Sequence, residues 1–236
     1  EAKKYLPAEL HPWMTRKTTK RTVMTIPYNA TRSSSWGYIR EALVEQGFEP
    51  EKSQVSEVVS AVYQSMDAIV PGPMRVMRWI KAHVGQYIRS GATEVEWTTP
   101  SGFVVNQQRN KRETERLKLQ LLGTTQVTLS VGDGDPCPNR HKSSTAPNLI
   151  HSLDASILHE TFQRFNGPFT VIHDSVLCRA TDMGTLNQLV RETYTDIFTR
   201  DCWLSKFGEA INAAEPPPIV GTLDPEVVED STYFFC

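Results

Sequence analysis

Four side chains of different chemistry recur at intervals of four in the stretch TRKTTKRTVMTIPYN (15–29): Arg16, Lys20, Met24 and Tyr28. Residues four apart share one face of a helix, so the stretch predicts a helix that displays a column of two cations, a thioether and a phenol. Cations held in this way can bind phosphate groups. A run of charges is also a common solvated helix face, and the spacing alone leaves both interpretations open.

A second candidate site lies in FTVIHDSVLC, residues 169–178. Two apolar, β-rich arms flank the polar triplet His173, Asp174 and Ser175, which predicts a strand, a turn and a strand. The Asp174 carboxylate would then stand at the tip of a rigid element, and a catalytic metal ligand requires rigid placement. Asp is also a common turn former, so a purely structural role for Asp174 is the alternative.

The elements that must position these groups are helices and short hairpins. Thr15 is a predicted N-cap, and Pro27 should end or kink the first helix near Ile26 because proline lacks an N–H. Further helices are expected at 38–46, 55–69, 73–90, 151–165 and 185–199, and hairpins within 94–108 and 115–131. Turns or loops are expected at 29–37 and 132–139, and an extended linker at 213–221.

The second hairpin, roughly Arg109 to His141, carries polar side chains on one face of its first strand: Arg116, Lys118 and Gln120. A two-stranded ribbon fits the DNA major groove, where Arg and Gln can bind base edges. The alternative is a strand with one ordinary solvated face.

Bulk composition is that of a globular protein, with 39% hydrophobic and 22% charged residues among 236. No apolar run approaches the roughly 18 residues of a membrane span, and the first residues lack the layout of a signal peptide. The four cysteines are scattered without a C-x-x-C pair, which favours reduced thiols in a cytoplasmic protein.

Charge is distributed unevenly along the chain, although the total is only −2. Residues 1–40 hold eight Lys and Arg against two Glu, a net charge of +6, whereas residues 182–236 hold ten Asp and Glu against three cations, a net charge of −7. This asymmetry suits a protein that meets phosphate with one part of its chain.

The pattern Arg16-x3-Lys20-x7-Tyr28, followed far downstream by His-Asp-Ser, resembles the B and C motifs of the single-subunit RNA polymerases of phages and mitochondria. RTVMTIPY is similar to that family's helix for the incoming nucleotide, WTTPSGFVV to its W-x-T-P-x-G-F-x-V segment, and STAPNLIHSLDASIL to its APN-x-x-HS-x-D-x-S helix. ERLKLQLLG resembles the start of its promoter-reading hairpin, and LVRETY and the terminal YFF follow in the family's order. The resemblance runs from about residue 5 to the end.

The resemblance implies DNA-directed RNA synthesis, in which ribonucleoside triphosphates react on a DNA template with two magnesium ions. Asp174 would be a metal ligand and His173 its support. Arg16 and Lys20 would grip the triphosphate, and Lys20 would also protonate the leaving pyrophosphate. Tyr28 would help to exclude deoxynucleotides near the 2′ position.

Other roles are implied for residues farther along the chain. His151 would contact the nascent base pair, or else be a core histidine bonded to backbone. Met24 would pack in the core or contact a base. The second hairpin would read the promoter or line the path of the RNA transcript, and Trp36 is the candidate for separating the downstream DNA strands.

The implied fold is α+β, a right-hand polymerase with mostly helical fingers and β-hairpins at 1–150 and part of a palm at 151–236. The nucleotide-binding helix would be 15–28, and the catalytic turn 169–178. In the family the other catalytic aspartate and the thumb lie upstream of the first motif, where this chain has only fifteen residues. Because one carboxylate cannot hold two magnesium ions, the chain is expected to be inactive alone. A second polymerase chain or a missing N-terminal part would supply the rest, in the cytoplasm of a phage-infected bacterium.

Two other functions fit the same residues. A-family DNA polymerases share the palm and fingers but usually have Glu after the His-Asp pair, where this chain has Ser175. A non-catalytic nucleic-acid-binding subunit could keep the fold without needing the candidate active-site residues. Asn29 and Pro27 depart from the family, which usually has glycine and a small helix former at these positions.

Overall fold

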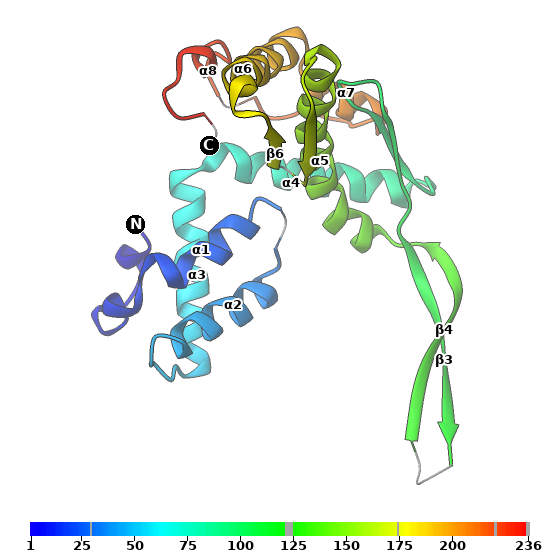
Figure 1. Ribbon diagram of the computed structural model, residues 1–236. Coiled ribbons are helices and arrows are strands. Elements are labelled where there is room, and N and C mark those ends of the chain that lie inside the picture. The colour runs from blue at the N-terminus through cyan, green and yellow to red at the C-terminus, as the bar shows by residue number, and fades with distance from the viewer. Residues whose placement is uncertain (29, 121–124, 174, 220, 235–236) are drawn as a thin grey trace. The chain divides into compact units, whose positions relative to one another are not determined.

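The computed structural model describes residues 1–28, 30–120, 125–173, 175–219 and 221–234 (Figure 1). The chain forms two compact units. The first consists of Glu1–Ile80 and Pro218–Gly221, and the second of Lys81–Pro217 and Thr222–Cys236. Helix α4, Pro71–Arg89, contributes residues to both units.

The first unit is helical. Two short 3-10 helices, η1 (Ala2–Tyr5) and η2 (Ala8–Trp13), precede α1 (Arg16–Thr25), α2 (Arg32–Val44), α3 (Lys52–Ile69) and the first part of α4. Helices α1, α2 and α3 pack together around a set of fully buried aliphatic side chains: Leu10, Ile39, Leu43, Val55, Val58 and Val62. Their spacing of three or four residues within each helix produces one apolar face.

Both ends of α1 follow from the sequence. The Thr15 hydroxyl oxygen accepts the N–H of Thr18, which confirms the predicted N-cap. The helix ends at Thr25, two residues before Pro27, as predicted.

Helix α2 begins earlier than the sequence suggested. The turn predicted at 29–37 is wrong from Arg32 onward, because the Thr31 hydroxyl accepts the N–H of Ser34 and α2 starts at Arg32. The Thr and Ser residues therefore cap a helix instead of forming a loop. Helices α3 and α4 lie close to their predicted positions.

The second unit carries three separate antiparallel hairpins among its described residues. They are β1–β2 (Val95–Thr98 and Val104–Gln107), β3–β4 (Asn110–Leu119 and Thr125–Pro136) and β5–β6 (Phe169–Ile172 and Ser175–Cys178). All three were predicted. The long β3–β4 ribbon extends away from the helices of its own unit (Figure 1).

The loop predicted at 132–139 is wrong. Strand β4 continues to Pro136, and helix α5 begins at once with Pro138 and runs to Arg164. Proline suits the first turn of a helix because the N–H there has no intrahelical partner, so Pro138 marks a helix start.

The remaining elements of the second unit are η3 (Ala180–Asp182), α6 (Met183–Arg200), α7 (Trp203–Ala210) and α8 (Val227–Asp230). Helix α5 packs on α6 through Leu153 and Ile197, and the Trp203 indole donates to the Ile197 carbonyl at 2.8 Å. The buried Arg191 donates to the carbonyls of Val228 and Ser231, both at 2.6 Å, which holds the C-terminal segment on α6.

The structure confirms a mixed α+β chain, and the boundary at residue 150 between fingers and palm stays a prediction. No helix among the described residues has the length and apolar character to cross a bilayer. Within the described ranges Cys137, Cys178 and Cys202 are free thiols, as predicted, and Cys236 lies outside those ranges.

Candidate functional site

The column on α1 is an exposed face of the first unit. Thr18, Thr22 and Ile26 point into the core and are almost fully buried. Arg16 and Lys20 lie on the opposite, exposed side. The helix therefore separates its residues as the spacing of four predicts, with small threonines inward and long cations outward.

The four cations of α1 fall into two pairs. Lys17 binds Glu45, the residue that follows α2, at 3.1 Å, and Arg21 binds Glu41 of α2 at 3.0 Å. The Arg21 guanidinium also lies 4.0 Å from the centre of the Tyr38 ring. These two cations hold α1 against α2.

Arg16 and Lys20, by contrast, have no carboxylate partner within the part of the chain that the structure describes. Both are exposed, so their charges are available to an external anion. Carboxylate partners therefore distinguish Lys17 and Arg21 from Arg16 and Lys20, the two predicted phosphate-binding cations.

Met24 and Tyr28 continue the column beyond the cations. Met24 is 58% exposed, so core packing within this chain, one of its two predicted roles, is wrong. Tyr28 is 41% exposed and follows the end of α1, where its N–H donates to the Thr25 carbonyl at 3.1 Å. The neighbouring Asn29 lies outside the described residues.

The predicted catalytic turn is the connection between β5 and β6. Ile172 pairs with Ser175, so only two residues join the strands, and His173 adopts a left-handed backbone with φ of 57°. Two-residue hairpin connections favour such positive φ values. Asp174, the predicted metal ligand, lies outside the described residues; His173 is exposed.

Aromatic packing fixes the start of this hairpin on α5. The Phe169 ring stacks on Phe162 with centroids 3.9 Å apart, and it meets Phe165 edge-on at 6.3 Å. The other apolar residues of the hairpin are largely uncovered: Ile172 is 60% exposed and Leu177 is 56% exposed. A lone two-stranded hairpin is marginally stable, so these exposed side chains mark a face that other protein could cover.

A family model described as DNA-dependent RNA polymerase matches residues 2–216, which includes both candidate sites. The chain belongs to the DNA-dependent RNA polymerase family. The resemblance to single-subunit polymerases drawn from the motifs is thereby confirmed.

Relatives of this polymerase chain include enzymes of phages and organelles. This chain is 27% identical to the DNA-directed RNA polymerase of Pseudomonas phage phiKMV, and the match covers 94% of this chain and 28% of that protein. The chloroplastic/mitochondrial DNA-directed RNA polymerase 2 of Arabidopsis thaliana is 31% identical, and the match covers 93% of this chain and 23% of that protein. The human mitochondrial DNA-directed RNA polymerase is 29% identical, and the match covers 96% of this chain and 20% of that protein. The chain thus spans about a quarter of the length of these curated relatives.

The β3–β4 hairpin presents its predicted polar residues to solvent. Arg116 pairs with Thr128 and Lys118 with Gln126, and all four are exposed. Gln120 is exposed just beyond the end of β3. On the opposite face Leu117 is 38% and Leu129 45% exposed, so the apolar side of the ribbon does not pack fully on the described part of this polymerase chain.

His151 is an exposed residue of α5 rather than a core histidine, so that alternative is wrong. It lines a cavity of about 650 Å³ with Asn148 and Arg109. The buried histidine of this helix is His141, which the sequence did not single out as a site residue.

His141 lies in a buried polar network at the base of the β3–β4 hairpin. Its Nε2 accepts the backbone N–H of Arg109 at 3.2 Å, and its Nδ1 lies 3.3 Å from the Gln107 amide group. Gln107 also contacts Thr145 at 2.8 Å and Asn148 at 2.7 Å. Burial, and secondarily the charge of Arg109, lowers the pKa of His141, so the neutral imidazole is the favoured form.

Trp36 lies inside α2, half-buried, and packs against the core of the first unit. It borders an open cavity together with Arg40 and Lys52. Its predicted contact with downstream DNA stays a prediction.

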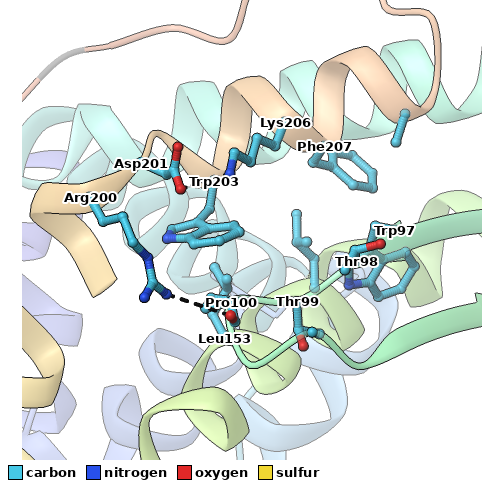
Figure 2. Close-up of a pocket in the computed structure, with 13 residues that line it drawn as sticks. Trp97, Thr98, Thr99, Pro100, Leu153, Arg200, Asp201, Trp203, Lys206 and Phe207 are labelled. Carbon is cyan, nitrogen blue, oxygen red and sulfur yellow. Dashed lines mark hydrogen bonds and ion pairs between the residues drawn. The ribbon is translucent and has the colours of Figure 1, made fainter. Parts of the chain in front are cut away.

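An aromatic cavity of about 460 Å³ lies between the β1–β2 loop, α5 and α7, as Figure 2 shows. Trp97, Trp203 and Phe207 form its apolar wall. Its cations are already engaged, because Arg200 binds Glu160 at 2.9 Å and Lys206 binds Asp201 at 2.7 Å. We therefore assign this cavity to packing between elements and not to recognition of an anion.

Proposed function

We propose that this chain carries the nucleotide-binding helix and part of the catalytic palm of a DNA-directed RNA polymerase. One observation carries the proposal: Arg16 and Lys20 are exposed without a described carboxylate partner, whereas Lys17 and Arg21 are paired. The family match across this helix supports the same role.

The proposed reaction joins a ribonucleoside triphosphate to the end of a growing RNA. The 3′-hydroxyl of the RNA gives up its proton to solvent and its oxygen bonds to the α-phosphorus. The bond from that phosphorus to the bridging oxygen breaks, and pyrophosphate leaves. Arg16 would neutralise charge on the triphosphate through bidentate hydrogen bonds. Lys20 would donate a proton to the leaving pyrophosphate.

Tyr28 would face the sugar of the same nucleotide. It stands beyond the cations at the end of α1 and is partly exposed. Its hydroxyl can hydrogen-bond a 2′-hydroxyl, and a deoxynucleotide would leave that bond unmade. Preference for ribonucleotides is the expected consequence, and it separates this function from that of an A-family DNA polymerase.

We propose that Asp174 would be a ligand of magnesium, because Mg²⁺ prefers oxygen ligands and commonly uses one or two carboxylates. Two such ions would neutralise charge on the phosphates during transfer. The described residues contain no cluster of three or more His, Cys, Asp or Glu that could hold a metal. The chain spans only about a quarter of the length of its curated relatives, and we propose that a second carboxylate comes from protein outside these 236 residues.

The β5–β6 hairpin supports this completion from outside. Ile172 and Leu177 form an exposed apolar face of the hairpin, and Val171 is exposed on the other face. Such an apolar face is costly to leave in water. We propose that a further part of the palm, on the same polypeptide or on a second polymerase chain, covers this face and brings the second aspartate and the thumb.

Nucleic acid would meet the chain at several elements of the second unit. Arg116, Lys118 and Gln120 on the β3–β4 ribbon would read the promoter in the major groove or line the path of the transcript. His151 would contact the nascent base pair, with His173 positioning the catalytic turn. In the first unit, Trp36 would meet the downstream DNA.

The direct test is RNA synthesis by the assembled polymerase with Asp174→Asn. Loss of synthesis with retained assembly is expected, because the amide cannot replace the charge of a magnesium ligand. Unchanged synthesis would contradict the proposal and favour a non-catalytic nucleic-acid-binding subunit. Incorporation of deoxynucleotides in preference to ribonucleotides would favour a DNA polymerase.

A further inference from the structure

We propose that the base of the β3–β4 hairpin holds a backbone phosphate of a nucleic acid strand, in a pocket formed by Arg109, Arg112 and Arg140. All residues that line the pocket belong to the second unit, whereas the α1 column belongs to the first. The identity of its ligand as nucleic acid rests on the proposed function, whereas its preference for an anion follows from the side chains.

The pocket has a volume of about 460 Å³ and is lined almost entirely by polar groups. Three guanidinium groups border it, against a single carboxylate, that of Asp133. None of the three arginines forms an ion pair with a carboxylate in the described ranges of the chain. Like charges gathered around one cavity repel each other, so an anion bound between them would be stabilised.

Two of these guanidinium groups are held in place by neutral partners. The Arg109 Nε donates to the Ser144 hydroxyl at 3.1 Å, and its Nη1 to the Gln108 carbonyl at 3.4 Å. Arg140 donates from Nη1 to the Asn110 carbonyl. Neutral partners orient the groups without cancelling their charge, and the remaining N–H donors suit a phosphate.

The start of α5 adds to the positive electrostatic potential of the pocket. Cys137 precedes the helix and offers no side-chain hydrogen bond to its first turn, which contains Arg140. The uncapped end of a helix of 27 residues carries a partial positive charge. Together with three unpaired guanidinium groups, it makes the pocket a site for an anion.

The neighbouring cavity suggests how a strand would continue. Gln108 and Arg109 line both the arginine pocket and the cavity that contains His151. A strand whose phosphate binds at Arg109 can therefore extend along α5 toward His151. The two cations of the aromatic cavity in Figure 2 differ from the arginines of this pocket, because both already pair with carboxylates.

Binding of fluorescent single-stranded DNA and RNA oligonucleotides to the 236-residue chain, over about 50 to 200 mM salt, tests the proposal. Arg112→Gln and Arg140→Gln should each weaken binding about tenfold, as expected for loss of a charge-assisted hydrogen bond. Each should also reduce the slope of log K against log salt by about 0.7. Asp133→Asn should strengthen binding.

The matched control is Arg89→Gln, which makes the same charge change at an exposed arginine of α4. It should alter affinity less than about twofold and leave the slope unchanged, because Arg89 does not line the pocket and should make no phosphate contact there. Arg112→Lys and Arg140→Lys keep the charge but lose the planar fork, and they should fall between wild type and the Gln variants. Thermal melting of each variant checks that it remains folded.

Three results would overturn the proposal. The first is equal effects of the pocket variants and Arg89→Gln, and the second is no oligonucleotide binding by the wild-type chain. The third is an effect of the pocket variants on binding of labelled ATP with none on oligonucleotides, which would assign the phosphate to a free nucleotide. An assembled enzyme that makes no RNA would instead overturn the proposed function, and this binding result would remain.

Discussion

The ammonium nitrogen of Lys17 lies 3.1 Å from a carboxylate oxygen of Glu45, and this ion pair joins α1 to α2. Lys20 is three residues farther along the same helix and has no carboxylate partner within the described ranges. The two lysines therefore have different surroundings, one inside a helix–helix contact and the other open to an external anion.

The first prediction compares these two lysines in the assembled polymerase. Lys20→Gln should lower kcat for nucleotide addition about 10²- to 10³-fold, because a positioned charge at the leaving group is lost. Lys17→Gln should leave kcat within about twofold and cost at most about 1 kcal/mol of stability, as is usual for an exposed ion pair. Single-turnover RNA extension and denaturant unfolding measure the two effects, and equal kinetic losses would contradict the assignment.

The second prediction concerns the uncovered face of β5–β6. Leu177→Ser should change the unfolding free energy of the isolated chain by no more than about 0.5 kcal/mol, because the side chain is already exposed. The same change should weaken assembly with the rest of the polymerase by about tenfold or more, if that face becomes buried. Thr170→Ser, which removes only a methyl group from the residue paired with Leu177, is the control. Unchanged assembly would show that the face stays in water.

The third prediction follows from the lowered pKa of His141. The unfolded chain, with an ordinary histidine pKa near 6.5, binds a proton more readily than the folded chain. The stability from neutral His141 is therefore complete above about pH 6.5 and is lost as pH falls from there through the lowered pKa. Unfolding free energies between about pH 5 and 7.5 should decline with acid less steeply in His141→Gln than in wild type. Parallel curves for the two proteins would refute this role.

The fourth prediction separates reading of bases from general charge on the β3–β4 ribbon. Arg116→Ala should relax promoter preference at one position, where a good base contact provides about 1 to 3 kcal/mol of discrimination. Glu115→Ala, on the opposite face of the strand, should leave that preference intact. Transcription from promoters with single base changes measures the preference. An equal loss on every promoter would indicate a phosphate contact instead.

Local sequence signals account for much of the fold. Thr15 and Pro27 mark the two ends of α1, and all three hairpins follow from alternating residues around turn signals. The errors arose where one signal has two meanings. The residues around Thr31 predict a turn, but Thr and Ser also cap helices, and the prolines of 132–139 predict a loop, but proline at Pro138 begins a helix.

The sequence predicts those features of the candidate site that lie within one segment, and it does not predict contacts between distant segments. The exposed column of α1 follows from its spacing, but the difference between Lys17 and Lys20 depends on where α2 places Glu45. The arginine pocket was missed because Arg109 and Arg140 are distant in sequence and meet only when the hairpin closes on α5. The role of His141 is absent from the predictions for the same reason, since it lies on α5 and its partner Gln107 lies on β2, 34 residues away in sequence.

The central proposal is that the α1 column and the β5–β6 turn act on the same nucleotide in the assembled polymerase. The most direct measurement replaces Mg²⁺ by Fe²⁺ in the assembled polymerase with bound nucleotide and maps backbone cleavage by the hydroxyl radicals formed at the metal. We predict cleavage at residues 172–176 and within 16–28 in one sample, and loss of both with Asp174→Asn. Cleavage confined to one of these segments, or unaffected by Asp174→Asn, would contradict the account.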